Sequence, residues 1–112
     1  IILILLLIMP LIGFGQNTYI TNPLYYACPT EEALHDIVRL SVVWMNSGKQ
    51  KDYESAMNAI RKGSCWQFLG GSEVSLIKKT FDGTIVHLKH LRGSDGNGFN
   101  SYWTVIEGVK EK

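Results

Sequence analysis

The sequence lacks an excess of charge of either sign. Its 11 basic and 10 acidic residues give a formal net charge of +1. Up to Cys65 there are five residues of each sign, and beyond it there are six basic and five acidic residues. Proteins that bind nucleic acid carry a basic patch or stripe, so we expect no nucleic-acid partner. Internal repeats and low-complexity tracts are also absent. The 112 residues are enough for one domain and too few for two.

Long apolar runs are almost absent as well. The one exception is Ile1–Ile12, which is followed directly by Gly13-Phe14-Gly15-Gln16. A membrane-spanning helix needs about 20 apolar residues, whereas a shorter run followed by small residues is typical of a secretory signal peptide. We therefore expect a signal peptide over residues 1–15, similar to those of the Bacteroidota, and a mature domain over residues 16–112. A retained single-pass anchor is the alternative, and in that case the uncleaved segment is the only membrane contact.

Cysteine is scarce, and Cys28 and Cys65 are the only two in the chain. An exported protein enters an oxidising compartment, where such a pair forms a disulfide. Closing the long loop between them contributes about 4 kcal/mol in the chain-entropy treatment. That is a large share of the roughly 5–15 kcal/mol by which a domain is stable. The sequence therefore predicts a disulfide-bonded protein of the periplasm or the extracellular space.

Two helices are predicted between the cysteines. The first begins at Thr30, a good N-cap that two acidic residues follow, and it ends at Asn46-Ser47-Gly48. The second begins near Asp52 and ends at Gly63. The short polar link predicts an antiparallel hairpin over residues 30–62. Such a hairpin brings the two cysteines side by side, as a disulfide requires.

Apolar side chains follow the first helix at helical spacing. The stripe consists of Leu34, Ile37, Val38, Ser41 and Met45. Further apolar residues, Leu40, Val43 and Trp44, widen this stripe. We therefore expect the helix to be covered on more than one side.

The chain after the second cysteine predicts a curled antiparallel sheet over residues 66–105. Asp82-Gly83 is the strongest hairpin signal, and a two-residue turn there pairs Ile77 with Leu88. The residues assigned to the core on this register are Ile77, Phe81, Val86 and Leu88. We expect residues 16–27 to form an extended arm, and residues 106–110 one helical turn.

These elements predict an α+β fold, an N-terminal antiparallel helix hairpin followed by a small antiparallel SH3-like β-barrel. The pattern resembles small exported bacterial proteins with a disulfide-linked helix pair and an SH3-like barrel. The motifs that carry the resemblance are Cys28, Gly63-Ser64-Cys65, Asp82-Gly83 and Tyr102-Trp103-Thr104-Val105. The resemblance implies this fold and brings no catalytic motif with it.

No catalytic cluster or metal site is predicted. Residues 63–68 resemble the segment around the nucleophilic cysteine of papain-like proteases, but Gly70-Gly71 ends any helix there and a disulfide would consume the thiol. His87 and His90 lie three residues apart on a strand and thus face opposite sides of the sheet. His35 lies on the solvent side of the first helix. We therefore predict neither a metal ion nor a cofactor.

A binding surface is predicted in the groove between the strand hairpin and the final loop. Its members are Lys89, Arg92, Phe99, Tyr102 and Trp103. We interpret the chain as a secreted or periplasmic, non-enzymatic, monomeric domain that binds a protein, a peptide or a cell-envelope glycan. Two alternatives stay open, a small cysteine hydrolase that uses Cys65 and an inhibitor that presents residues 92–100 to a secreted hydrolase.

Overall fold

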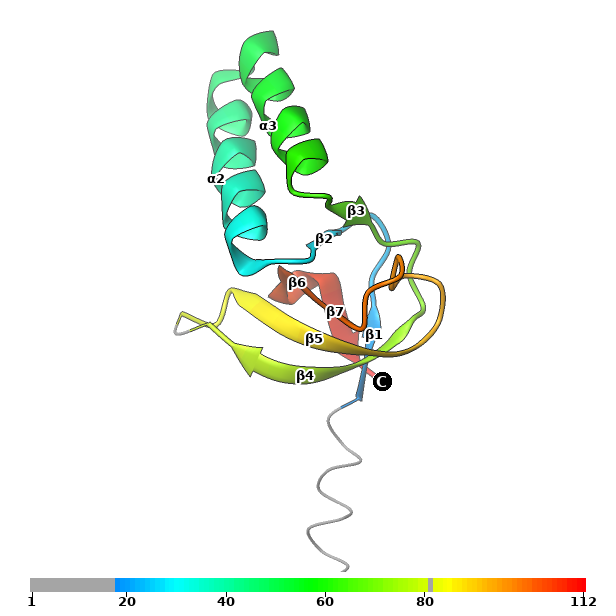
Figure 1. The fold of residues 1–112 in the computed structure, drawn as a ribbon. Helices are drawn as coiled ribbons and strands as arrows, with labels where there is room; N and C mark the ends of the chain where they lie inside the picture. The colour runs from blue at the N-terminus through cyan, green and yellow to red at the C-terminus, as the bar shows by residue number, and fades with distance from the viewer. Residues whose placement is uncertain (1–17, 81) are drawn as a thin grey trace, which may run out of the picture.

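The structure is a computed structural model that describes residues 18–80 and 82–112. The predicted signal peptide, residues 1–15, lies outside this range. In the described residues, strands precede and follow a pair of helices (Figure 1). The elements are β1 (Thr18–Thr21), β2 (Tyr26–Cys28), α2 (Glu31–Ser47), α3 (Gln50–Lys62), β3 (Trp66–Gln67), β4 (Glu73–Lys79), β5 (Ile85–Arg92), β6 (Ser101–Val105), a 3₁₀ turn (Ile106–Gly108) and β7 (Val109–Glu111).

All seven strands form one antiparallel sheet in the order β3-β2-β6-β5-β4-β1-β7. The predicted fold, a helix hairpin followed by an SH3-like barrel, is wrong on two counts. The segment expected to be an extended arm supplies β1 and β2, so the sheet includes strands from before the helices. The sheet is also open, because its edge strands β3 and β7 each pair with one neighbour. These edge strands are only two and three residues long.

The β4–β5 hairpin forms at the predicted place but in a different register. Lys79 pairs with Val86 as expected, yet a β-bulge between Leu76 and Lys78 pairs Leu76 with Leu88. A bulge adds one unpaired residue to its strand and strengthens the local twist. Ile77 is that residue and is 50% exposed, so its predicted core position is wrong. The predicted core position of Phe81 lies outside the described residues.

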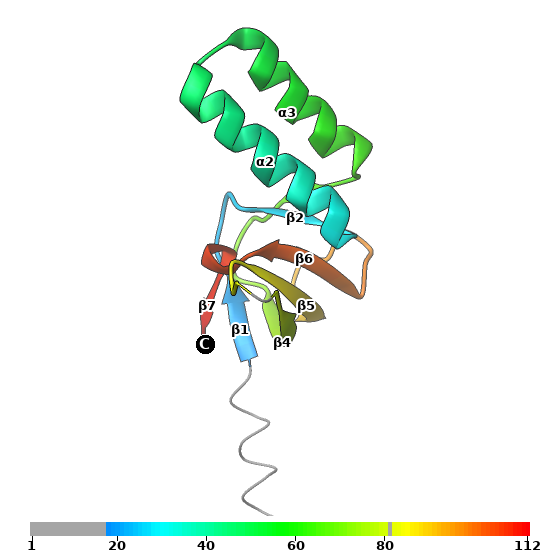
Figure 2. The same cartoon turned by 90° about the vertical axis from the view of Figure 1, so that its left-hand side faces the viewer.

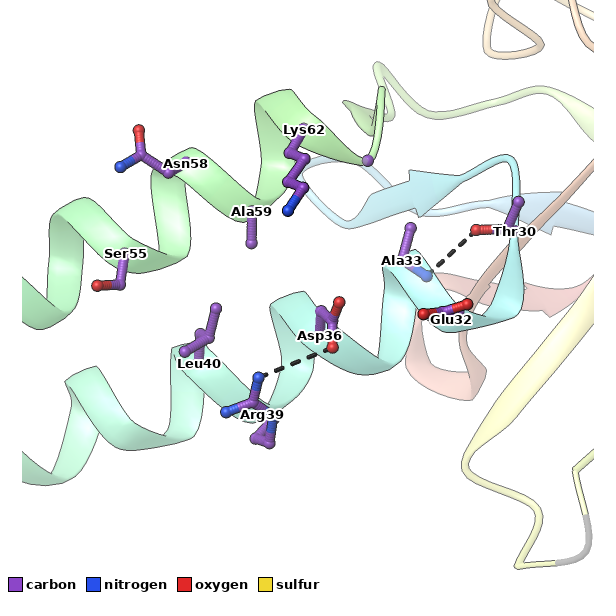
Figure 3. A pocket seen from close by; sticks show the side chains of 11 residues that line it. Thr30, Glu32, Ala33, Asp36, Arg39, Leu40, Ser55, Asn58, Ala59 and Lys62 are labelled. Atoms are coloured by element: carbon purple, nitrogen blue, oxygen red, sulfur yellow. Dashed lines mark hydrogen bonds and ion pairs between the residues drawn. The ribbon is translucent and has the colours of Figure 1, made fainter.

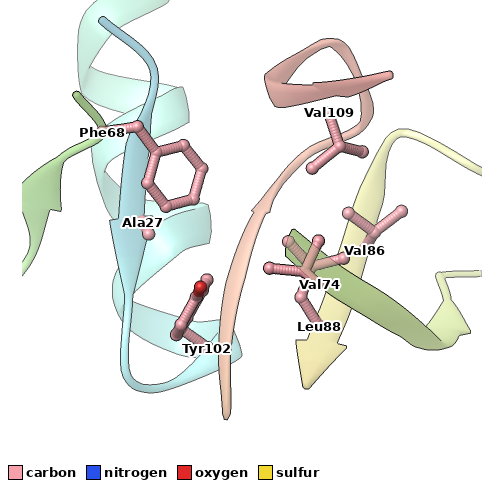
Figure 4. Packing of buried hydrophobic residues seen from close by; sticks show 7 residues of the cluster. All are labelled: Ala27, Phe68, Val74, Val86, Leu88, Tyr102 and Val109. Carbon is pink, nitrogen blue, oxygen red and sulfur yellow. The ribbon is translucent and has the colours of Figure 1, made fainter. Parts of the chain in front are cut away.

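One face of the curled sheet encloses the main core (Figure 4). Tyr102 lies at its centre with its side chain fully buried and edge-on contacts to Phe68. Leu76 takes the place opposite Leu88 that the predicted register gave to Ile77, and it packs against this core. The buried members are Ala27, Phe68, Val74, Val86, Leu88, Tyr102 and Val109.

The opposite face of the sheet packs against the base of the helix pair (Figure 2). This second core consists of Cys28, Leu34, Ile37, Ile85 and Trp103. The predicted disulfide is present at its edge, because Cys28 at the end of β2 is bonded to Cys65 just after α3, with 4.2 Å between the Cα atoms. The disulfide therefore ties the base of both helices to the sheet.

Helix α2 begins and ends where local signals place it, whereas α3 begins at Gln50, two residues before the predicted cap Asp52, which lies in its first turn. The hydroxyl of Thr30 accepts a hydrogen bond from the backbone N–H of Ala33 at 3.2 Å, and α2 ends at Gly48, whose φ of 66° suits glycine. The hairpin then projects away from the sheet (Figures 1 and 2). Its outer part is uncovered, with Val42, Val43 and Met45 exposed. The expected coverage of this helix on more than one side is wrong there.

Candidate functional site

The residues of the predicted binding surface do not lie on one surface. Tyr102 and Trp103 are neighbours on β6, so their side chains enter the two different cores on opposite faces of the sheet. Tyr102 is fully buried and Trp103 is 9% exposed. Burial and the nearby charge of Asp95 raise the pKa of the Tyr102 hydroxyl. Neither aromatic side chain can touch a partner in this conformation.

The other three members remain accessible. Arg92 forms an ion pair with Glu73 across the β4–β5 pair, and Phe99 stacks on Trp66 with ring centroids 5.3 Å apart and planes 5° apart. The Lys89 side chain is exposed. These contacts stabilise the hairpin and the final loop, and a partner for these residues stays a prediction.

The histidines take part in separate structural contacts. His87 stacks on Trp103 at 4.3 Å between ring centroids, and burial, followed by the charge of Lys78, lowers its pKa. His90 contacts the Tyr102 hydroxyl through Nδ1 at 2.6 Å, and the carbonyl of Gly93 through Nε2 at 3.0 Å. Within residues 18–80 and 82–112, no three His, Cys, Asp or Glu side chains are grouped so as to hold a metal ion.

Cys65 is held in the disulfide. A cysteine hydrolase needs a thiolate at this position, so the bonded form cannot supply the nucleophile of that alternative. The part of the chain that the structure describes has no free cysteine, and none of its helices is long and apolar enough to cross a membrane.

A cleft of about 510 Å³ opens between the two helices (Figure 3). It exists because small side chains face each other there, with Ala33 on α2 and Ala59 and Ser55 on α3. Its rim is polar, and the Asp36 carboxylate is already 3.7 Å from the Arg39 guanidinium on the same helix. Of the four charged residues that line the cleft, Asp36 and Arg39 are therefore already paired with each other.

A second hollow differs from this cleft in being almost wholly apolar. We call it the α2 groove. It has a volume of about 370 Å³ and runs along α2 beside the segment that precedes β2. Its lining consists of Leu24, Tyr25, Tyr26, Leu34, Ile37, Val38, Ser41, Val42, Met45 and Val105.

The α2 groove forms because α2 extends past the sheet. The apolar stripe that starts at Leu34, buried in the second core, continues to Val42 and Met45, which are 50% and 75% exposed. A soluble domain gains no stability from apolar side chains that stay in water. The sequence predicts this stripe as far as Met45, without Val42, and predicts it to be buried. The prediction is wrong for Met45, because α2 extends past the sheet.

Leu24 forms the other side of the groove and is the least expected residue in it. Its φ is +76°, a left-handed conformation that costs an L-residue about 1–2 kcal/mol, and it follows Pro23 at a turn position that normally takes glycine or asparagine. Its side chain is 72% exposed. Strained backbone of this kind is concentrated at functional sites. No pattern in the sequence indicated this residue.

Comparison of the chain with family models, with curated protein sequences and with solved structures finds no match. The resemblance to small exported bacterial proteins therefore stays a prediction.

Proposed function

We propose that this protein is an exported, non-enzymatic binding domain that holds an apolar segment of another protein in the α2 groove. Its place of action is the periplasm or the extracellular space. The apolar leader and the disulfide support export, and the disulfide fixes the hairpin that carries the groove. The observation that carries the binding proposal is the strained, solvent-exposed Leu24 opposite the exposed half of the α2 stripe.

The α2 groove is better suited to bind a partner than the surface around Lys89. Binding energy comes mainly from apolar and aromatic side chains that are desolvated at the centre of an interface. The groove presents Leu24, Val42 and Met45 together. Two of the three aromatic residues predicted for the surface around Lys89, Tyr102 and Trp103, are buried in the protein core.

Site-specific photo-crosslinking in the native cells tests this proposal. A photoreactive amino acid replaces Met45 in one variant and Lys89 in another, and the cross-linked peptides are identified by mass spectrometry. We expect a discrete product from position 45, joined to one polypeptide, and at least a fivefold lower yield from position 89. Reconstitution with the purified partner should reproduce the product.

Two adjacent residues of α2 provide a matched control. Val42 lines the groove, whereas Val43 is similarly exposed and does not line it. Val42→Asp should abolish the product from position 45, and Val43→Asp should leave it in place. Equal loss with both variants, or a product only from position 89, would contradict the proposal.

A further inference from the structure

We infer that the occupant of the α2 groove is an amphipathic α-helix of the partner protein. This inference rests on the proposed function and names the chemistry of the segment that is bound. Three features of the groove carry it. They are the hydrogen bonds already made by the backbone groups that line it, its opening to solvent and its size.

The groove offers few free backbone groups to an extended peptide. On the α2 side, the backbone groups are engaged within the helix. On the other side, the Leu24 N–H donates to the Phe68 carbonyl at 2.9 Å, and the Leu24 carbonyl accepts from the Gln67 side chain at 2.9 Å. The carbonyls of Tyr25 and Tyr26 accept from the Phe68 N–H at 2.8 Å and the Thr104 hydroxyl at 2.7 Å.

A peptide that binds as an added strand gains affinity from main-chain hydrogen bonds. The groove has no row of free backbone groups to supply them, so it favours an occupant that satisfies its own backbone groups. An α-helix does so within one segment. Helix-in-groove recognition is therefore the mode that this lining supports.

The groove is also open along its outer part. Leu24, Val42 and Met45 line it and yet are at least half exposed. An occupant lying against them keeps its other side in water. That requirement fits an amphipathic helix, whose apolar stripe is narrow and whose opposite face is polar, better than a uniformly apolar acyl chain.

The size of the groove argues for a short segment rather than a second copy of this chain. The groove follows α2 from Leu34 to Met45, which is roughly 17 Å at the helical rise and equals about three turns of a partner helix. A stable dimer interface buries about 800 Å² on each subunit. The exposed large apolar residues that line the groove are only Leu24, Tyr25, Val42 and Met45, too few to make up an interface of that size.

The inferred recognition has a definite pattern. The partner helix should place apolar anchors at positions i, i+3 or i+4, and i+7. No charged residue lines the groove, so ion pairs contribute little and the affinity should depend only weakly on salt.

Selection from a library of random 16-residue peptides tests the inference. The folded, disulfide-bonded protein is the target, Val42→Asp serves for counter-selection and Val43→Asp is the matched control. We expect peptides that bind the protein and the Val43→Asp variant alike and that carry anchors at helical spacing. A proline in the middle of a selected peptide should weaken binding at least tenfold. A change from 50 to 300 mM salt should alter the affinity less than threefold.

The outcomes separate the inference from the proposed function. Groove-dependent peptides whose anchors alternate at every second residue, and which tolerate the proline, would overturn the helix inference and leave the binding function standing. Peptides that bind the Val42→Asp variant as well as the unmodified protein would overturn both. Groove-dependent binding of palmitate without any groove-dependent peptide would identify an acyl-chain site and also overturn both.

Discussion

At the scale of single residues, Asp95 does the most to organise the loop after β5. It is 2% exposed, and its carboxylate accepts hydrogen bonds from the Thr21 hydroxyl at 2.7 Å and from the N–H groups of Leu69 and Gly70 at 2.7 and 3.0 Å. Its carbonyl accepts from the Trp66 indole at 2.7 Å. One side chain therefore joins β1, the β3–β4 connection and the final loop.

Burial by itself raises the pKa of Asp95, but the hydrogen bonds from Thr21, Leu69 and Gly70 outweigh it and lower the pKa below its usual value. A lowered pKa in the folded state means that this stabilisation is complete above the unfolded pKa, near 4. It is lost as the pH falls through the folded pKa.

We predict that Asp95→Asn lowers the free energy of unfolding at pH 7 by about 2 kcal/mol or more, because charged hydrogen bonds contribute about 1.5–3 kcal/mol. The difference from the unmodified protein should shrink below pH 4. Urea unfolding between pH 2.5 and 7 measures both effects, with the exposed neighbour substitution Ser94→Ala as control. A constant difference across this range would contradict the assignment.

At the scale of elements, the β4–β5 hairpin is the place where the local sequence pattern fails to predict the observed register. The bulge turns Ile77 toward solvent and brings Val74 and Leu76 into the positions that regular pairing gives to Ser75 and Ile77. Alternation along a strand cannot reveal a bulge, because both faces of β4 carry apolar residues. The turn itself was predictable, since the Asp82 carboxylate accepts hydrogen bonds from nearby Thr80 and Thr84.

The register makes a quantitative prediction. Leu88→Ala removes a fully buried side chain and should lower the free energy of unfolding by about 2–5 kcal/mol. Ile77→Ala removes a half-exposed one and should cost less than about 1 kcal/mol, as surface substitutions do. Denaturant unfolding of the two variants compares them directly. Equal losses would indicate regular pairing of Ile77 with Leu88.

Local signals specified the helix pair well. Thr30 and Gly48 mark the ends of α2, and the Cys28–Cys65 bond could be inferred because an antiparallel pair brings its two ends together.

The strands β1 and β2 have only four and three residues, too few for a recognisable alternation. Their partners also lie far along the chain, in β4 and β6. A pattern within a few residues cannot predict pairing between segments so far apart in the chain.

At the scale of the whole molecule, the sheet contacts the helix pair only at the base of the hairpin. The second core holds Leu34 and Ile37 from α2, and the outer part of α2 extends beyond the sheet (Figure 2). The candidate site therefore depends on the length of α2 relative to the sheet. The length of α2 relative to the sheet cannot be inferred until the order of the strands is known. The α2 groove could therefore not be predicted from the sequence.

On the proposed function, the exposed side chains of the α2 groove serve a partner and not the fold. The most direct test is the free energy of unfolding of a Leu24→Gly, Met45→Gln double variant. Glycine relieves a strain of about 1–2 kcal/mol but adds about 0.5–1 kcal/mol of chain entropy to lose, and Met45 is largely exposed. We predict a stability that is unchanged or up to about 1 kcal/mol higher. A loss of about 2 kcal/mol or more would show that these side chains hold the fold together and would contradict the account.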